Sequence, residues 1–94
     1  MECREIIFSG HAVRRMFERA IDKNAVKRVI QEGNLIAEYP KDTPYPSYLM
    51  LGFANETAIH VVASKDSETT NCYVITAYLP DPSLWESDFQ TRRS

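Results

Sequence analysis

Ser9-Gly10-His11-Ala12-Val13-Arg14-Arg15-Met16-Phe17-Glu18-Arg19-Ala20 is the stretch that decides how this chain folds. If it is wound as a helix, the apolar side chains of Val13, Met16, Phe17 and Ala20 gather on one side. His11, Arg15 and Arg19 follow one another on the other side. The apolar side must be buried, because so short a helix is not stable alone in water. We therefore expect a helix over residues 10–20, capped by Ser9, that carries part of a functional site.

The residues that follow predict a second helix and then a sheet. Asp22 is suited to cap a helix over residues 23–32, and Gly33 is suited to end it at the C′ position. Beyond Gly33 the apolar period changes from near four to two, which is typical of strands. We expect four antiparallel strands, over residues 35–39, 48–53, 58–64 and 71–78.

The two ends of the chain are less regular. Residues 5–8 are either a short strand or an apolar lead-in to the first helix. Near the other end, Pro80-Asp81-Pro82 interrupts the sheet, and a proline at the first helical position predicts a short closing helix that buries Leu84, Trp85 and Phe89. The sequence therefore predicts an α+β fold: one domain over residues 1–94, with two N-terminal helices packed on a four-stranded antiparallel sheet and a short C-terminal helix.

The composition is that of a soluble globular protein, with 44% hydrophobic and 26% charged residues. No apolar run approaches the roughly 20 residues that span a bilayer, so we expect a cytoplasmic protein without a membrane segment. Cys3 and Cys72 lack the C-x-x-C spacing of a redox or metal motif. We interpret them as buried thiols in a reducing cytosol, with a disulfide between them as the alternative.

Charge is distributed unevenly along the chain. Residues 11–28 contain six Lys or Arg and two acids, whereas residues 34–91 contain two Lys and eight acids, and two arginines lie near the end. A basic helical surface of this kind is suited to a phosphate-bearing partner. The alternative is a solvated helix face that is basic for solubility only.

A series of short strings in this chain resembles a bacterial family known as domain of unknown function 4258. The strings are Ser9-Gly10-His11-Ala12, Arg15-Met16, Glu18-Arg19, Tyr39 to Ser47, Leu51-Gly52-Phe53, His60-Val61-Val62-Ala63, Ile75 to Pro82, Trp85 and Asp88-Phe89. The resemblance covers nearly the whole chain. It implies a fold similar to the RelE/ParE toxins and the wider barnase–colicin–RelE group of ribonucleases. It also implies a toxin-type endoribonuclease, or an inactive relative, with a small zinc-finger antitoxin encoded nearby as its partner.

Metal-independent RNA cleavage needs a base for the 2′-hydroxyl, an acid for the leaving 5′-oxygen and cations for the phosphate. His11 and Arg15 on the first helix and His60 in the third predicted strand are the candidate catalytic residues. The candidate RNA- and phosphate-binding residues are Arg14, Arg19, Thr76, Tyr78 and Arg92.

Each of these residues also has a structural interpretation. His11 is equally suited to bond to the backbone, and Arg15 to pair with Glu18 or with an acid of the sheet. His60 lies in an apolar run, where a histidine is more often a hydrogen-bonded core residue. It joins Thr76 and Tyr78 on one face only if the hairpin pairs residues whose numbers sum to an even value.

Aromatic residues flank the proline-rich loop after the second helix. Exposed tyrosines there (Tyr39, Tyr45 and Tyr48) would stack on unpaired bases. We favour the alternative that this segment packs as a rigid lid over the core.

Other chemistries have little support in the sequence. Two histidines and two scattered cysteines form no zinc motif, and three isolated glycines form no phosphate loop, so we expect neither a metal nor another cofactor. The leading hypothesis is a toxin-type, metal-independent endoribonuclease that binds RNA. The alternative is a non-catalytic module, a decayed toxin relative, that docks a protein partner through its basic helix face or an open sheet edge.

Overall fold

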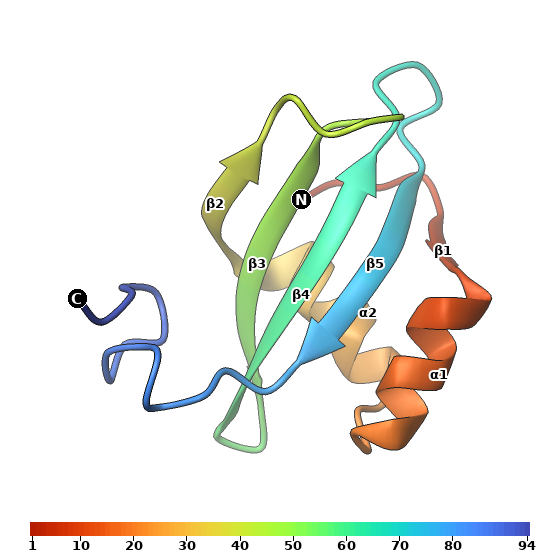
Figure 1. The fold of residues 1–94 in the computed structure, drawn as a ribbon. Coiled ribbons are helices and arrows are strands. Elements are labelled where there is room, and N and C mark those ends of the chain that lie inside the picture. Colours follow the sequence, from red (N-terminus) through yellow and green to blue (C-terminus); the bar gives the residue numbers. More distant parts are fainter.

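The computed structural model describes residues 1–94 as one sheet with two helices (Figure 1). In chain order the elements are β1 (Ile6–Phe8), α1 (Gly10–Glu18), α2 (Lys23–Glu32), β2 (Asn34–Tyr39), β3 (Ser47–Ala54), β4 (Thr57–Lys65) and β5 (Cys72–Tyr78). The sheet has the strand order β1-β5-β4-β3-β2. The predicted α+β class and the two N-terminal helices are therefore confirmed.

Both predicted helix caps are present. The Ser9 hydroxyl accepts a hydrogen bond of 3.0 Å from the Ala12 amide, and the Asp22 carboxylate accepts one of 3.3 Å from the Ala25 amide. α1 ends at Glu18, earlier than expected, because Ala20 adopts a left-handed backbone with φ 55° that a helix cannot contain.

Gly33 ends α2, but not through the left-handed conformation that its position suggested. Its φ is −75° and its backbone is extended. A glycine is needed here because two segments of the chain approach each other closely. A Cβ atom would lie 2.4 Å from the Val29 carbonyl oxygen and 2.5 Å from that of Leu51. Gly33 thus lets α2 lie directly against β3.

The prediction of a four-stranded, wholly antiparallel sheet is wrong, because β1 adds a fifth strand. β1 pairs in parallel with β5, from Ile6 opposite Cys72 to Phe8 opposite Val74. The remaining strands form the expected antiparallel meander. A strand of three residues is too short to show a period, and its partner is the last strand of the chain, so no local pattern indicates the pairing.

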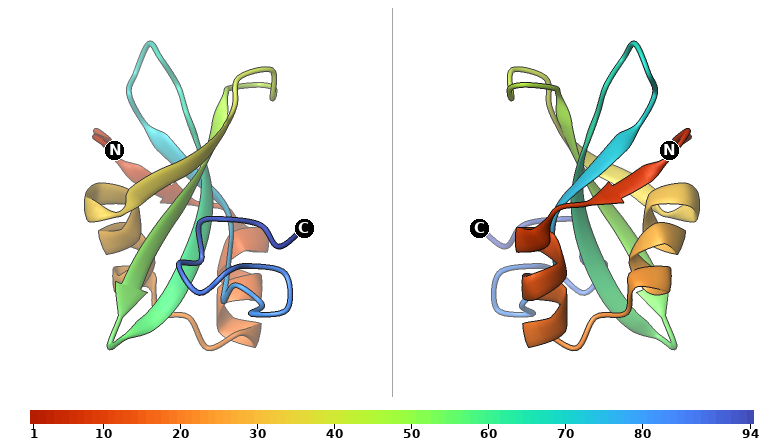
Figure 2. Two further views of the ribbon diagram at one scale, coloured as in Figure 1. Left: turned by 90° about the vertical axis from the view of Figure 1, so that its left-hand side faces the viewer. Right: turned by 90° about the vertical axis from the view of Figure 1, so that its right-hand side faces the viewer.

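The sheet separates α2 from the C-terminal segment. Figure 2 shows α2 on one side of the sheet and residues 80–94 on the other. The core lies between the helices and the sheet, and it includes Met16, Val26, Ile30, Met50, Val61 and Val74. We call the opposite side of the sheet, which the C-terminal segment partly covers, the distal face.

The predicted C-terminal helix is absent. The Asp81 carboxylate accepts a hydrogen bond of 2.8 Å from the Ser83 amide, and the Asp88 carboxylate accepts bonds from Gln90 and Thr91. Such local side-chain bonds offer the backbone an alternative to helical hydrogen bonding. Residues 80–94 instead form turns held by a bridge between Trp85 and Arg92. Trp85 is buried, as predicted, but Phe89 is only half-buried and Leu84 is exposed, because no helix forms to turn them towards the core.

The interpretation of the cysteines as free thiols is also wrong. Cys3 and Cys72 form a disulfide, which ties the segment before β1 to the start of β5. A disulfide was the alternative that the sequence left open, because a separation of 69 positions along the chain conceals that the two cysteines are neighbours. Neither helix has the length and apolar character that crossing a bilayer requires.

Candidate functional site

The register of β4 and β5 brings three of the predicted polar residues to the distal face. His60 lies opposite Tyr78 and Val62 lies opposite Thr76, so the paired numbers sum to an even value, as the hypothesis required. A β-bulge follows, since Ala63 pairs with Val74. Because directly paired residues of an antiparallel ladder share a face, His60, Thr76 and Tyr78 lie together.

His60 is fully buried, and both of its ring nitrogens have partners. Nε2 lies 2.8 Å from the carbonyl oxygen of Phe89, and Nδ1 lies 3.2 Å from the hydroxyl oxygen of Tyr78. A carbonyl oxygen only accepts hydrogen bonds, so Nε2 carries a proton. Burial lowers the pKa of His60, although the bond to Phe89 opposes this effect, and the neutral ring is therefore favoured. In that ring Nδ1 is an acceptor, and the Tyr78 hydroxyl donates to it.

The surroundings of this pair fix its orientation. The Trp85 ring meets His60 edge-on, with ring centroids 4.6 Å apart and planes at 86°. Burial raises the pKa of Tyr78, the nearby Tyr39 adds to this effect and Arg92 opposes it. Tyr78 thus keeps its proton near neutral pH and remains a donor to His60.

Arg19 reaches the same region from the end of α1. Its guanidinium donates bonds of 3.2 Å to the Thr76 hydroxyl and 2.8 Å to the Ala77 carbonyl oxygen. β1 pairs only with residues 72–74 of β5, so at Ala77 the strand has β4 on one side and no strand on the other. Arg19 therefore joins the helix to the open end of β5, where a guanidinium has further N–H groups to offer.

Arg92 supplies a second cation. It lies over the Trp85 ring, 5.3 Å from the centroid, and it is exposed. Arg93 is paired with Glu86 at 3.3 Å, whereas Arg92 has no carboxylate partner. Its charge is therefore available to a phosphate.

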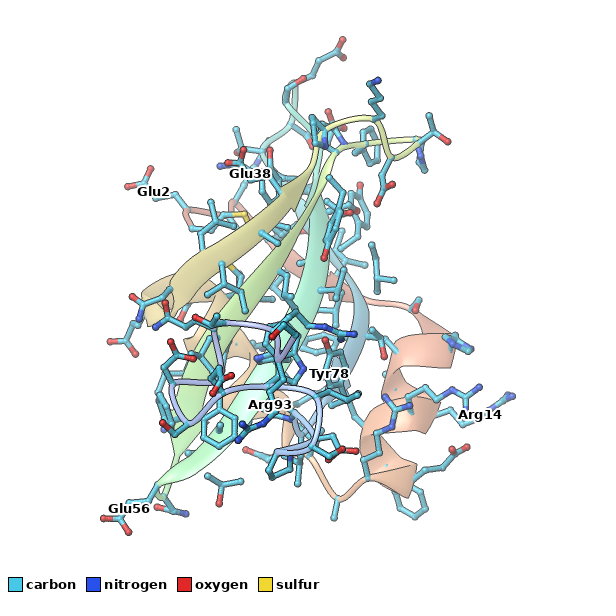
Figure 3. The ribbon with its side chains drawn as sticks, turned by 60° about the vertical axis from the view of Figure 1, so that its left-hand side comes forward. Glu2, Arg14, Glu38, Glu56, Tyr78 and Arg93 are labelled. Carbon is cyan, nitrogen blue, oxygen red and sulfur yellow. A yellow bond between two sulfur atoms is a disulfide. The ribbon has the colours of Figure 1, made fainter.

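The other residues predicted on α1 do not make contact with this group. Arg15 is paired with Glu18 at 3.3 Å, and neither His11 nor Arg15 lines the cavity on the distal face. Figure 3 shows Arg14 on the outer side of α1, pointing away from Tyr78. The structure thus brings together Arg19, Thr76 and Tyr78 with His60. It directs Arg14 away from this group, and it shows no contact of His11 or Arg15 with it.

The tyrosines around the proline-rich loop have different surroundings. Tyr45 stacks on Tyr73, with centroids 5.6 Å apart and planes at 12°, which agrees with a packed lid. Tyr48 pairs with Ala63, a member of the core on the helix side. Tyr39 alone of the three lies beside Tyr78, where it lines a cavity on the distal face.

Two features of the distal face were not predicted as parts of a site. The Phe89 carbonyl is a backbone group, so no residue type indicates it. Trp85 was predicted as core, and it is buried, but its ring also holds His60 and Arg92 in place. The turns of the C-terminal segment bring these groups over the sheet.

Comparison with known families accounts for most of the chain. The family described as "Domain of unknown function (DUF4258)" matches residues 8–79. The chain belongs to this family. Neither a curated protein nor a solved structure matches it. The match runs from Phe8 to Leu79, so both helices and strands β2 to β5 lie within it. Most of β1 precedes it, and Trp85, Phe89 and Arg92 lie beyond it.

The polar groups of the molecule do not form a metal centre. No group of three or more His, Cys, Asp or Glu side chains is placed to hold a metal ion. The groups on the distal face that can transfer protons or bind anions are His60, Tyr78 and the arginines Arg19 and Arg92.

Proposed function

We propose that this protein binds single-stranded RNA on the distal face of its sheet and cleaves it as a toxin-type, metal-independent endoribonuclease. The observation that supports the proposal is the hydrogen bond from the Tyr78 hydroxyl to Nδ1 of a buried, neutral His60. This site differs from the one that the sequence suggested, because His11 and Arg15 have no part in it.

The pair is suited to move a proton between two oxygen atoms of RNA. The Tyr78 oxygen accepts the proton of the 2′-hydroxyl while its own proton passes to Nδ1 of His60. The 2′-oxygen attacks phosphorus, and the bond to the 5′-oxygen breaks. The proton then returns from His60 through Tyr78 to the leaving 5′-oxygen, which gives a 2′,3′-cyclic phosphate and a free 5′-hydroxyl.

Charges on either side of the pair suit a phosphate. Arg19 is held beside Thr76 at one edge, and Arg92 lies over Trp85 near the other. Guanidinium groups bind phosphate oxygens through two parallel bonds and stabilise the charge that develops in the transition state. The Phe89 carbonyl, bonded to Nε2, stabilises the imidazolium that forms transiently.

The toxin assignment depends on the resemblance of this family to the RelE/ParE toxins, which is a fold analogy. It carries two further proposals with it, a cytoplasmic location and a small zinc-finger antitoxin as partner. Arrest of growth when this chain is expressed alone, and its relief by the product of an adjacent gene, would support both.

The experiment is a cleavage assay on single-stranded RNA in the presence of EDTA. Tyr78→Phe keeps the ring and removes the hydroxyl, so we expect cleavage to fall roughly 100-fold or more. Tyr73→Phe is the matched control, because Tyr73 lies at the other end of β5 and stacks on Tyr45. Unchanged cleavage by Tyr78→Phe would show that Tyr78 is not catalytic. Loss of cleavage in His11→Ala would instead indicate an active site on α1.

A second candidate function is a non-catalytic protein-binding module. The observation in its favour is that the apolar side of α1 is not buried as predicted. Met16 is buried, but Phe17 is 87% exposed and Val13, one turn away, is 40% exposed. A module of this kind predicts that wild type cleaves no RNA and that Phe17→Ala abolishes binding to a partner protein.

A further inference from the structure

A groove runs along the distal face beside the His60–Tyr78 pair. Its volume is about 390 Å³, and it lies between the C-terminal segment and strands β2 and β3. Its apolar floor includes Ile36, Ala37 and Leu49. We call this cavity the distal groove.

The polar groups of the distal groove restrict what it can hold. They are the hydroxyls of Tyr39 and Tyr78, the Gln90 amide and the Arg92 guanidinium, and no carboxylate is among its lining residues. A cationic ligand or a metal ion would have no countercharge there. The groove therefore suits a neutral or anionic molecule with a flat apolar body.

Aromatic rings supply the walls for such a body. The Tyr39 ring, at the end of β2, is 41% exposed, and Trp85 is nearly buried beneath Arg92. An exposed, rigidly held ring beside a cation is the combination on which unpaired bases stack in single-strand binding proteins.

We propose that the distal groove holds one unpaired nucleobase of the RNA strand, with its ring against Tyr39 and its hydrogen-bonding edge at the Gln90 amide. Arg92 then contacts the adjacent phosphate, and the neighbouring sugar lies at the Tyr78 hydroxyl. The proposal rests on the function proposed above and adds a recognition site to it, since the groove selects an unpaired base next to the bond that is cleaved.

The test uses the full chain and a short 2′-O-methyl oligoadenylate, which has no 2′-hydroxyl and is bound without being cleaved. The matched probe has the same backbone without bases. Trp85 is the only tryptophan and lines the groove, so its fluorescence reports occupancy. We expect the oligoadenylate to change this emission and to bind about 5- to 100-fold more tightly than the abasic probe, the effect of one stacked base.

Variants locate the effect. Tyr39→Ala should lose most of the difference between the two probes, whereas Tyr45→Ala should keep it, because Tyr45 lies over Tyr73 away from the groove. Equal affinity for both probes, unchanged Trp85 emission at saturation, or full discrimination by Tyr39→Ala would overturn the proposal.

The cleavage assay separates this proposal from the proposed function. Cleavage by wild type together with equal affinity for the two probes removes the base site and leaves the nuclease. Base-dependent binding without cleavage would support the base site and contradict the proposed nuclease activity.

Discussion

Arg19, the residue that follows α1, donates a hydrogen bond of 2.8 Å to the carbonyl oxygen of Ala77 in β5. Ala77 is fully buried, and it lies beyond the part of β5 that pairs with β1. A single guanidinium thus joins the first helix to the last strand and completes the hydrogen bonding of that strand. The same side chain bonds to Thr76, so the fold and the proposed site share it.

Arg19→Ala should lower the free energy of unfolding by about 1–2 kcal/mol, because it leaves the Ala77 carbonyl with water as its only partner and removes a charged donor. Urea unfolding followed by circular dichroism measures the loss. Arg14→Ala is the control, since Arg14 makes no hydrogen bond or ion pair and should change stability by no more than about 0.5 kcal/mol. Equal stability of the two variants would show that the bond contributes nothing.

Gly33 and Gly10 should respond in opposite ways to substitution by alanine. A Cβ at Gly33 would meet two backbone oxygens at 2.4 and 2.5 Å, which cannot move without separating α2 from β3. We expect Gly33→Ala to cost about 1–3 kcal/mol or more. Gly10 has nothing within 4 Å and no positive φ, so Gly10→Ala should stabilise the protein by about 0.4–1 kcal/mol. Thermal unfolding of the two variants compares them, and a neutral Gly33→Ala would contradict the close approach.

Local signals in the sequence were sufficient for the helices and the meander. Ser9 and Asp22 cap the helices that they were predicted to cap. The alternation of residues placed Thr76 and Tyr78 on one face of β5, but the register that joins them to His60 was left open and comes from the structure. The caps and the alternation depend on residues that are near one another in the chain, which is where patterns of period and capping carry information.

The errors share one cause, which is contact between distant parts of the chain. β1 pairs with the last strand, and Cys3 bonds to Cys72. In the same way, the bonds of Arg19 to Thr76 and Ala77 were not predicted. No pattern within the first helix indicates these partners, because they lie 57 and 58 residues further along the chain.

The disulfide between Cys3 and Cys72 should contribute strongly to stability. It closes a loop across a sequence separation of 69 residues, and chain entropy alone then predicts about 4 kcal/mol as an upper value. Cys3→Ala should therefore lower the urea midpoint, and dithiothreitol should do the same for wild type. Dithiothreitol should leave the midpoint of the variant unchanged, and a further decrease there would mean that the reductant acts elsewhere.

The stability of the protein should depend on pH through His60. Burial lowers the pKa of His60 from its ordinary value of about 6.5, so the unfolded chain takes up a proton at a higher pH than the folded protein does. The free energy of unfolding should therefore fall as the pH falls below about 6.5. Urea midpoints at intervals between about pH 7.5 and 5.5 measure this dependence.

His60→Gln should flatten the curve in this range, while His11→Gln, an exposed position, should keep the wild-type slope. The lowered pKa values of Asp66, Asp81 and Asp88 act in a different range, because these groups lose stabilisation only as the pH falls towards and below about 4. If His60→Gln keeps the wild-type slope, the pH dependence in this range does not arise from His60.

Arg92 and Arg14 were both predicted to bind phosphate, and the structure places them on different surfaces, Arg92 over Trp85 and Arg14 on the outer side of α1 (Figure 3). If RNA lies on the distal face, Arg92→Ala should weaken binding of a non-cleavable oligonucleotide and reduce the slope of log affinity against log salt concentration by about 0.7, the value for one phosphate contact with a single strand. Arg14→Ala should leave both quantities unchanged. Titrations at several salt concentrations decide between the surfaces, because the reverse result would place the RNA on α1 and leave the His60–Tyr78 pair without a substrate.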